Sequence, residues 1–112
     1  MSIRTGPLPY TETTLGATKT SGSVDREGAL AAFRAEGCGA ARSWSNGAGD
    51  RYGSHDHGFH KVLFCLEGSI VFHTDEGDVA LSRGDRLDLP PGTTHAATVG
   101  PTGCSCIEAE RP

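Results

Sequence analysis

The sequence predicts a single all-β domain, an antiparallel sandwich or barrel, preceded by one short helix. After Gly39, apolar and polar residues alternate with a period of two, as they do in strands with one buried face. Gly, Asp and Pro interrupt this alternation every several residues, which is typical of short strands joined by tight turns. Parallel strands would need helical crossovers between them, and the pattern after Gly39 has no helical period. An antiparallel arrangement is therefore expected.

The chain divides into a flexible N-terminal segment, residues 1–22, and one domain, residues 23–112. The first segment is rich in Thr, Gly, Ser and Pro and has no helix or strand period, which is typical of a mobile tail. An arm laid across a neighbouring subunit is the alternative for this segment. The chain of 112 residues is long enough for one domain with a modest core.

Composition argues against several classes of protein. The formal net charge is -4, and acidic and basic residues are intermixed, which argues against a nucleic-acid or anionic-membrane surface. No apolar run approaches the roughly 18 residues of a membrane span, and the N-terminus lacks the apolar core of a signal peptide. We therefore expect a cytoplasmic protein in which the four cysteines are free thiols.

The helix is predicted over residues 23–36. Ser23 or Asp25 can cap its N-terminus, and Gly37 can end it. An apolar stripe runs along one side of this segment, formed by Ala29, Leu30, Ala32 and Phe33.

Strands follow, and their alternation assigns a face to each side chain. The predicted ranges are 41–45, 51–57, 60–67, 69–74, 78–82, 86–89, 95–99 and 104–108. The residues expected inside are Leu63, Cys65, Ile70, Phe72, Val79, Leu81, Leu87 and Leu89. The residues expected to face outwards are Glu67, Ser69, Val71, His73, Arg86 and Asp88, with Arg86 and Asp88 in solvent.

Three histidines form the candidate functional site. His55 and His57 are one residue apart on a predicted strand and therefore share a face, although they could also be solvated residues of an edge strand. His95 follows a Pro-Pro-Gly turn. If the fold brings His95 beside this pair, three neutral nitrogens converge, an arrangement that suits a divalent transition metal with open coordination positions. His60 and His73 are expected at the surface and are not assigned as ligands.

These residues resemble the two sequence motifs of the cupin superfamily, over about residues 40–109. The second motif is matched by Gly84, Pro90, Gly92 and His95, and the first in part by Gly49, His55, His57 and Gly68. Lys61 stands where most cupins have a metal-binding glutamate, and Val99 stands where the longer second motif has asparagine. The chain also looks like small single-domain cupins of unassigned function that carry lysine at this position.

The resemblance implies a double-stranded β-helix, the cupin jelly-roll barrel, with a short N-terminal helix. It implies a metal ion on His55, His57 and His95 near the barrel mouth, with Zn, Fe, Ni and Mn all open as its identity. Related cupins commonly form homodimers, so a homodimer is expected. Three-histidine iron sites occur among cupins that oxidise thiols or diketones, so the missing glutamate is compatible with catalysis.

Lys61 is the candidate catalytic residue, because alternation with Leu63 and Cys65 points it into the barrel. Three outcomes are open: it turns to solvent and leaves a three-histidine site; it is held neutral as a ligand or general base; or it anchors an anionic ligand and no metal binds. Cys65, Cys104 and Cys106 are expected in the core, with one thiol near the histidines as the alternative.

Two functional classes remain open. The first is a metalloenzyme, such as an oxygenase, isomerase or lyase, acting on a small polar or acidic compound. The second is a non-catalytic module that binds or senses a small molecule, with Lys61 as the anion anchor and no metal. The expected partner in both classes is a small-molecule ligand, and neither nucleic acid nor a membrane is expected. One fold hosts many functions, so the fold does not decide between them.

Overall fold

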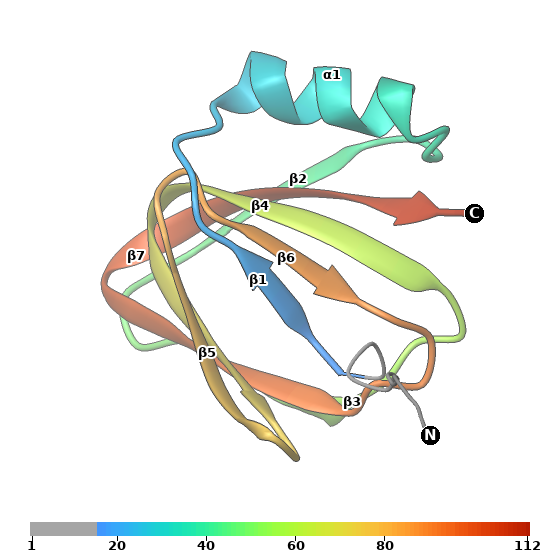
Figure 1. The fold of residues 1–112 in the computed structure, drawn as a ribbon. Helices are drawn as coiled ribbons and strands as arrows, with labels where there is room; N and C mark the ends of the chain where they lie inside the picture. The colour runs from blue at the N-terminus through green and yellow to red at the C-terminus, as the bar shows by residue number, and fades with distance from the viewer. Residues whose placement is uncertain (1–15) are drawn as a thin grey trace, which may run out of the picture.

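The structure, a computed structural model, describes residues 16–112 and contains one curled antiparallel sheet with one helix outside it (Figure 1). The elements in chain order are β1 (Thr18–Thr20), α1 (Arg26–Ala35), β2 (Arg42–Asn46), β3 (Arg51–His55), β4 (His60–Thr74), β5 (Gly77–Ser82), β6 (Arg86–Leu89) and β7 (His95–Arg111). The predicted fold class, an all-β jelly-roll barrel with a short helix, is confirmed.

Two long strands, β4 with 15 residues and β7 with 17, pair along nearly their whole lengths (Figure 1). Strands β5 and β6 pair with β4, β2 and β3 pair with β7, and β1 pairs with β6. The prediction that each was two strands separated by a turn is wrong. At Gly68 the ladder shifts register instead of ending, and Gly68 has a φ of 68°, which glycine adopts without strain. A Cβ at Gly68 would also collide with the carbonyl oxygen of Gly103. Such irregularities bend a strand, so the first half of β4 pairs with β6 and the second half with β5.

Helix α1 covers the outer face of β4 and β7. Of the two predicted caps Asp25 is the one used, since its carboxylate accepts a hydrogen bond of 2.9 Å from the amide of Gly28. Gly37, with a φ of 69°, follows the helix end as predicted. The helix buries its apolar stripe in a cluster formed by Ala29, Phe33, Val62, Phe64, Leu66, Ile107 and Ala109. No helix in the described part of the chain is long and apolar enough to cross a membrane.

The barrel interior is a separate apolar core. The predicted inward residues lie in it, with Val79 packed half-buried at its edge. The buried members are Leu63, Cys65, Ile70, Phe72, Leu81, Leu87, Leu89, Ala97, Val99, Cys104 and Cys106. All four cysteines of the chain are free thiols, and Cys38 is the one outside this core.

Strand β1 was not expected, because Thr18–Thr20 has no apolar alternation. It pairs with β6, opposite Asp88, Leu87 and Arg86, and it lies within the segment that the sequence predicts to be flexible. The rest of that expectation falls mostly on residues 1–15, which lie outside the described residues.

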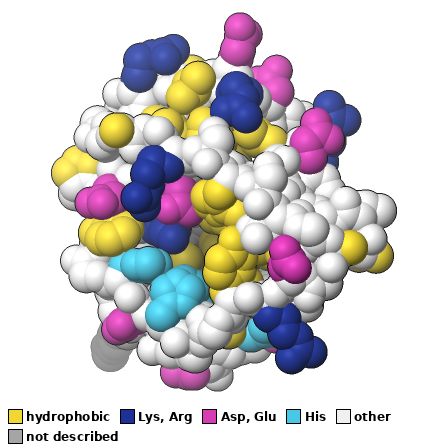
Figure 2. Space-filling model, turned by 180° about the vertical axis from the view of Figure 1, so that it is seen from behind, with side chains coloured by type: hydrophobic (Ala, Val, Ile, Leu, Met, Phe, Trp, Pro, Cys, Tyr) yellow, Lys and Arg dark blue, Asp and Glu magenta, His cyan; other side chains and the backbone are white. Residues whose placement is uncertain are grey.

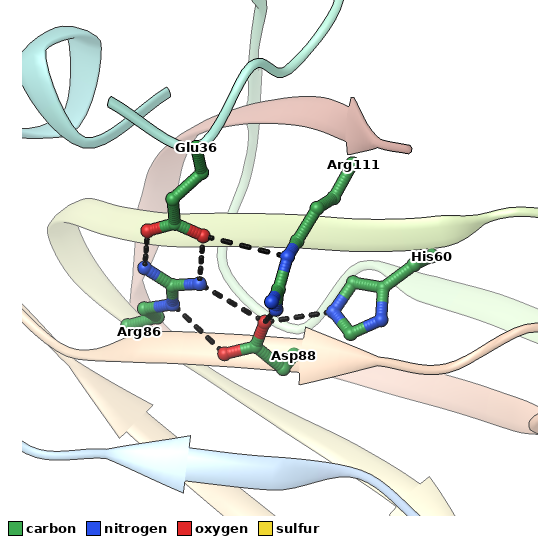
Figure 3. Close-up of polar contacts among 5 residues, drawn as sticks. All are labelled: Glu36, His60, Arg86, Asp88 and Arg111. Carbon is green, nitrogen blue, oxygen red and sulfur yellow. Dashed lines mark hydrogen bonds and ion pairs between the residues drawn. The ribbon is translucent and has the colours of Figure 1, made fainter. Parts of the chain in front are cut away.

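Arg86 and Asp88 face outwards as predicted, but they lie beneath the end of α1 and are only partly exposed (Figure 3). Arg86 donates to both carboxylate oxygens of Glu36, at 2.6 and 2.8 Å, and to Asp88 at 2.8 Å. His60 Nε2 lies 2.8 Å from Asp88 Oδ1. The hydrogen bonds from Arg86 lower the pKa of Glu36. The expectation of a solvated face is therefore wrong, because these charges fasten α1 to β6.

Candidate metal centre

His55, His57 and His95 converge, as the sequence predicted. His55 ends β3 and is the register partner of His95, which begins β7. Strand β3 stops at His55, so the predicted strand over residues 51–57 is too long and His57 lies in the loop that follows. A hydrogen bond of 2.8 Å from the amide of Gly92 to the carbonyl of His57 ties this loop to the turn before His95. One nitrogen from each imidazole lies within 4.8 Å of the other two.

The backbone fixes two of the three imidazoles. His55 Nδ1 lies 2.7 Å from the carbonyl oxygen of Gly53, and His95 Nδ1 lies 2.9 Å from that of Thr93. Because a carbonyl only accepts, Nδ1 carries the hydrogen in both rings and Nε2 keeps a free lone pair. This backbone contact is the kind of outer contact that orients metal-binding histidines in proteins.

His57 supplies the third nitrogen, and its environment fits a ligand. Its Nε2 is buried, and the described residues give it no hydrogen-bond partner. Such an orphan costs free energy unless something binds it. Burial lowers the pKa of His57, and the positive charge of Lys61 lowers it further. Burial also lowers the pKa of His95, although the contact to Thr93 partly opposes this. Both rings are therefore neutral at pH 7, the form that binds metal.

Two of the three histidines, His55 and His95, border a pocket of about 210 Å³. Figure 2 shows a hollow in this face of the molecule, with apolar side chains inside it and histidine side chains at its edge. His55 is exposed, whereas His95 is buried. The pocket is lined by Trp44, Tyr52, His55, Lys61, Leu63, Phe72, His95, Ala97 and Glu108. The site is thus reached from outside and has an apolar floor.

Lys61 points into this pocket, as its alternation predicted, and its side chain is 12 % exposed, so it does not turn to solvent. Its Nζ lies 3.3 Å from Glu108 Oε1. The same oxygen accepts a hydrogen bond of 2.8 Å from Trp44 Nε1, and Arg42 donates to the other oxygen at 3.3 Å. The ammonium therefore has a carboxylate partner inside the barrel.

Glu108 is the charged pocket residue that the sequence analysis missed, since it appeared there only as the end of a strand. The signal was present: Glu108 shares its face of β7 with Cys104 and Cys106, both expected in the core. A carboxylate on a buried face needs a cation or several donors, and Lys61 was the one charged residue already placed inside.

The remaining sequence candidates lie elsewhere. His60 contacts Asp88 outside the barrel, and His73 lies 2.8 Å from Asp78 and 2.9 Å from Thr98. Neither belongs to the histidine cluster, as expected. The buried cysteines do not line the pocket described above, and the metal-ligand cluster found among residues 16–112 contains histidines alone.

Residues 40–106 match the family of AraC-like ligand binding domains. The chain belongs to this family, and it has the cupin fold. An RmlC-like cupin from Shewanella frigidimarina NCIMB 400 is 28 % identical with a TM-score of 0.58, and the match covers 64 % of each chain. A cupin superfamily protein from Desulfitobacterium hafniense DCB-2 is 18 % identical with a TM-score of 0.59, over 63 % of this cupin and 64 % of that chain.

Among proteins of assigned activity, this cupin is similar to quercetin 2,3-dioxygenase of Bacillus subtilis (strain 168). The two are 39 % identical over 49 residues, which are 43 % of this chain and 14 % of that enzyme. The cupin thus corresponds to a small part of the enzyme's length.

Proposed function

We propose that this cupin holds a divalent transition metal on His55, His57 and His95 and binds a small polar molecule in the adjoining pocket. The observation that carries the proposal is the convergence of three imidazole nitrogens within 4.8 Å. The two Nδ1 contacts to backbone carbonyls and the orphaned Nε2 of His57 support it. Histidine nitrogens suit Zn, Fe and Ni, whereas Mn prefers oxygen ligands.

The chain's own groups define what happens around such a metal. A bound metal would supply Lewis acidity and open positions for a ligand oxygen. Leu63, Phe72 and Ala97 give the ligand an apolar bed and exclude water from one side of it. We assign Lys61 as the catalytic or orienting residue, since its ammonium faces the same space and can hydrogen-bond a ligand oxygen or give it a proton.

Metal analysis of wild type and single histidine variants tests the proposal. Protein purified without added metal should contain a transition metal, and His55→Ala and His95→Ala should abolish it while circular dichroism stays that of wild type. His73→Ala is the matched control, because that histidine lies outside the cluster. A wild-type protein that binds none of Zn, Fe, Ni or Mn on calorimetric titration would exclude the metal site.

A binding or sensing module without turnover is the second candidate. The family match, to ligand binding domains, supports this class. If the module binds its ligand without a metal, Lys61 anchors an anion. Lys61→Gln should then abolish ligand binding, and Lys61→Glu should create metal affinity. In the metal form Lys61→Gln keeps the metal, and Lys61→Glu tightens it by adding a carboxylate to three imidazoles. Equal metal affinity in wild type and Lys61→Glu would show that residue 61 does not face the metal site.

A metalloenzyme is favoured by the similarity to the dioxygenase, which is confined to a small part of that enzyme. We propose oxygenase chemistry on a small polar compound as the first activity to assay. Oxygen consumption by iron-loaded protein, compared with His95→Ala, separates this class from the binding module.

A further inference from the structure

Glu108 lies at the back of the pocket and is almost completely buried, with 7 % of its surface exposed. Its Oε1 contacts two donors, the ammonium of Lys61 at 3.3 Å and the indole of Trp44 at 2.8 Å. Its Oε2 contacts the guanidinium of Arg42 at 3.3 Å. Arg42 has a side chain that is 71 % exposed, so solvent screens much of its charge. The inner wall of the pocket is therefore a nearly neutral ion pair rather than a free cation.

This arrangement decides which charge a ligand can carry. A ligand oxygen that reaches Lys61 also approaches the carboxylate of Glu108, which lies on the same ammonium. A single negative charge finds Lys61 on one side and the histidine cluster on the other. A second negative charge would face Glu108 at short range in a partly dry pocket, where like charges repel strongly.

We propose that Glu108 is a specificity-determining residue that restricts the pocket to ligands with one negative charge or none. The inference rests on the proposed function of the pocket and adds the class of ligand. Its walls include the ring pair Trp44 and Tyr52, whose centroids lie 5.7 Å apart, together with Leu63, Phe72 and Ala97. With about 210 Å³ of space, below the ~300 Å³ at which pockets for drug-sized ligands begin, the occupant is a small, partly apolar monoanion or neutral compound.

The chain carries its own reporter for this test. Trp44 is the single tryptophan, and its indole donates to Glu108, so its fluorescence responds to changes at this wall. Three probes vary the charge: acetamide is neutral, acetate carries one negative charge, and phosphate carries close to two at pH 8. Titrations are run on metal-free protein and on zinc-loaded protein.

Wild type should bind acetate and acetamide more tightly than phosphate. Glu108→Gln keeps an acceptor for Trp44 but frees the charge of Lys61, and should raise phosphate affinity about tenfold, the effect of one unit charge a few ångströms away. Acetate should gain less and acetamide nothing. Glu108→Asp keeps the charge and should keep the wild-type order. Lys61→Gln combined with Glu108→Gln removes both charges and should reverse most of the gain.

Glu67→Gln, at an exposed carboxylate outside this pocket, is the control. The proposal is overturned if Glu108→Gln leaves the order of the probes unchanged, if Glu67→Gln produces the same gain, or if no probe alters the fluorescence of Trp44. If Glu108→Gln does not fold, Lys61→Gln tests the same wall, because it leaves the carboxylate of Glu108 without its ammonium. Phosphate should then lose more affinity than acetate, and equal losses for the two anions would overturn the proposal. Failure of the metal proposal appears separately, as absent zinc binding with charge selection intact in metal-free protein.

Discussion

Replacing His57 with leucine should stabilise the metal-free protein while destroying its response to metal. His57 Nε2 is a buried polar atom for which the described residues provide no hydrogen bond. Leucine has a similar volume and no polar atom, and it keeps an apolar contact with Phe59, whose ring centroid lies 4.9 Å from that of His57. The side chain at position 57 is therefore better suited to binding a metal than to packing in the core.

The expected magnitude follows from the orphaned atom. Leaving a buried polar group without a partner costs about 1–3 kcal/mol, and the rest of His57 is only partly buried, so the lower end applies. We expect the free energy of unfolding of metal-free His57→Leu to exceed that of wild type by ~1 kcal/mol. Metal at about 100 times its dissociation constant should stabilise wild type by ~2.7 kcal/mol, and His57→Leu should lose most of this increment.

Urea denaturation with a chelator and with added zinc measures both effects. His73→Leu is the matched control, because His73 has partners in Asp78 and Thr98 and its loss should destabilise the protein or leave it unchanged. If metal-free His57→Leu is less stable than wild type, the imidazole is part of the structural framework and the reasoning fails. The same holds if zinc stabilises the variant as much as wild type.

Three further predictions concern the rest of the fold. Arg86 holds the pKa of Glu36 below its ordinary 4.5. The ionised Glu36 therefore stabilises the fold above that pH, and this contribution is lost as the pH falls through the lower pKa of the folded state. Between about pH 6 and pH 3, urea titrations should show wild type losing more stability than Glu36→Gln. Phe33→Ala should cost about 3–5 kcal/mol by emptying the core under α1, measured by thermal unfolding. In residues 16–112, β2 and β3 pair with β7 alone, so each has a free edge. Covering these edges favours a homodimer. Sedimentation at micromolar concentration measures the oligomeric state, and a monomer would contradict this prediction.

The barrel could be predicted from the sequence because buried residues alternate with a period of two, and the folded structure keeps this pattern on the inner face. Leu63, Cys65, Ile70 and Phe72 all reached the interior predicted for them. The same reasoning failed at Gly68, where a glycine in a strand was interpreted as a turn. A glycine with positive φ is compatible with a turn and with a bulge, and the choice depends on whether a partner strand continues past it. Here β7 pairs with β4 on both sides of Gly68, and the local sequence around Gly68 does not show this.

The surroundings of the outer face were also harder to predict, because they depend on residues distant in the sequence. Alternation states that Arg86 and Asp88 point away from the interior, and it says nothing about what lies there. The helix had a predicted apolar stripe, but its docking site includes Val62 and Phe64, whose outward apolar side chains were not used as a signal. Apolar residues on both faces of one strand indicate that both faces are covered. This pattern at residues 62–66 would have placed α1 over β4 and buried the charges beside it.

In the proposed metal centre, Lys61 occupies the position that is usually a ligand, and Glu108 offsets its charge. An unpaired ammonium beside three imidazoles would oppose a dication and would itself be costly to bury. Glu108 removes both problems: it gives Lys61 an ion pair at 3.3 Å, and it is held in turn by Trp44 and Arg42. Lys61 and Glu108 lie on different long strands, β4 and β7. Their antiparallel register puts Leu63 opposite Glu108, and Lys61 lies two pairs further along, opposite Glu110. The pocket thus contains a carboxylate on the opposite strand, which pairs with the lysine and which we propose selects the charge of the ligand.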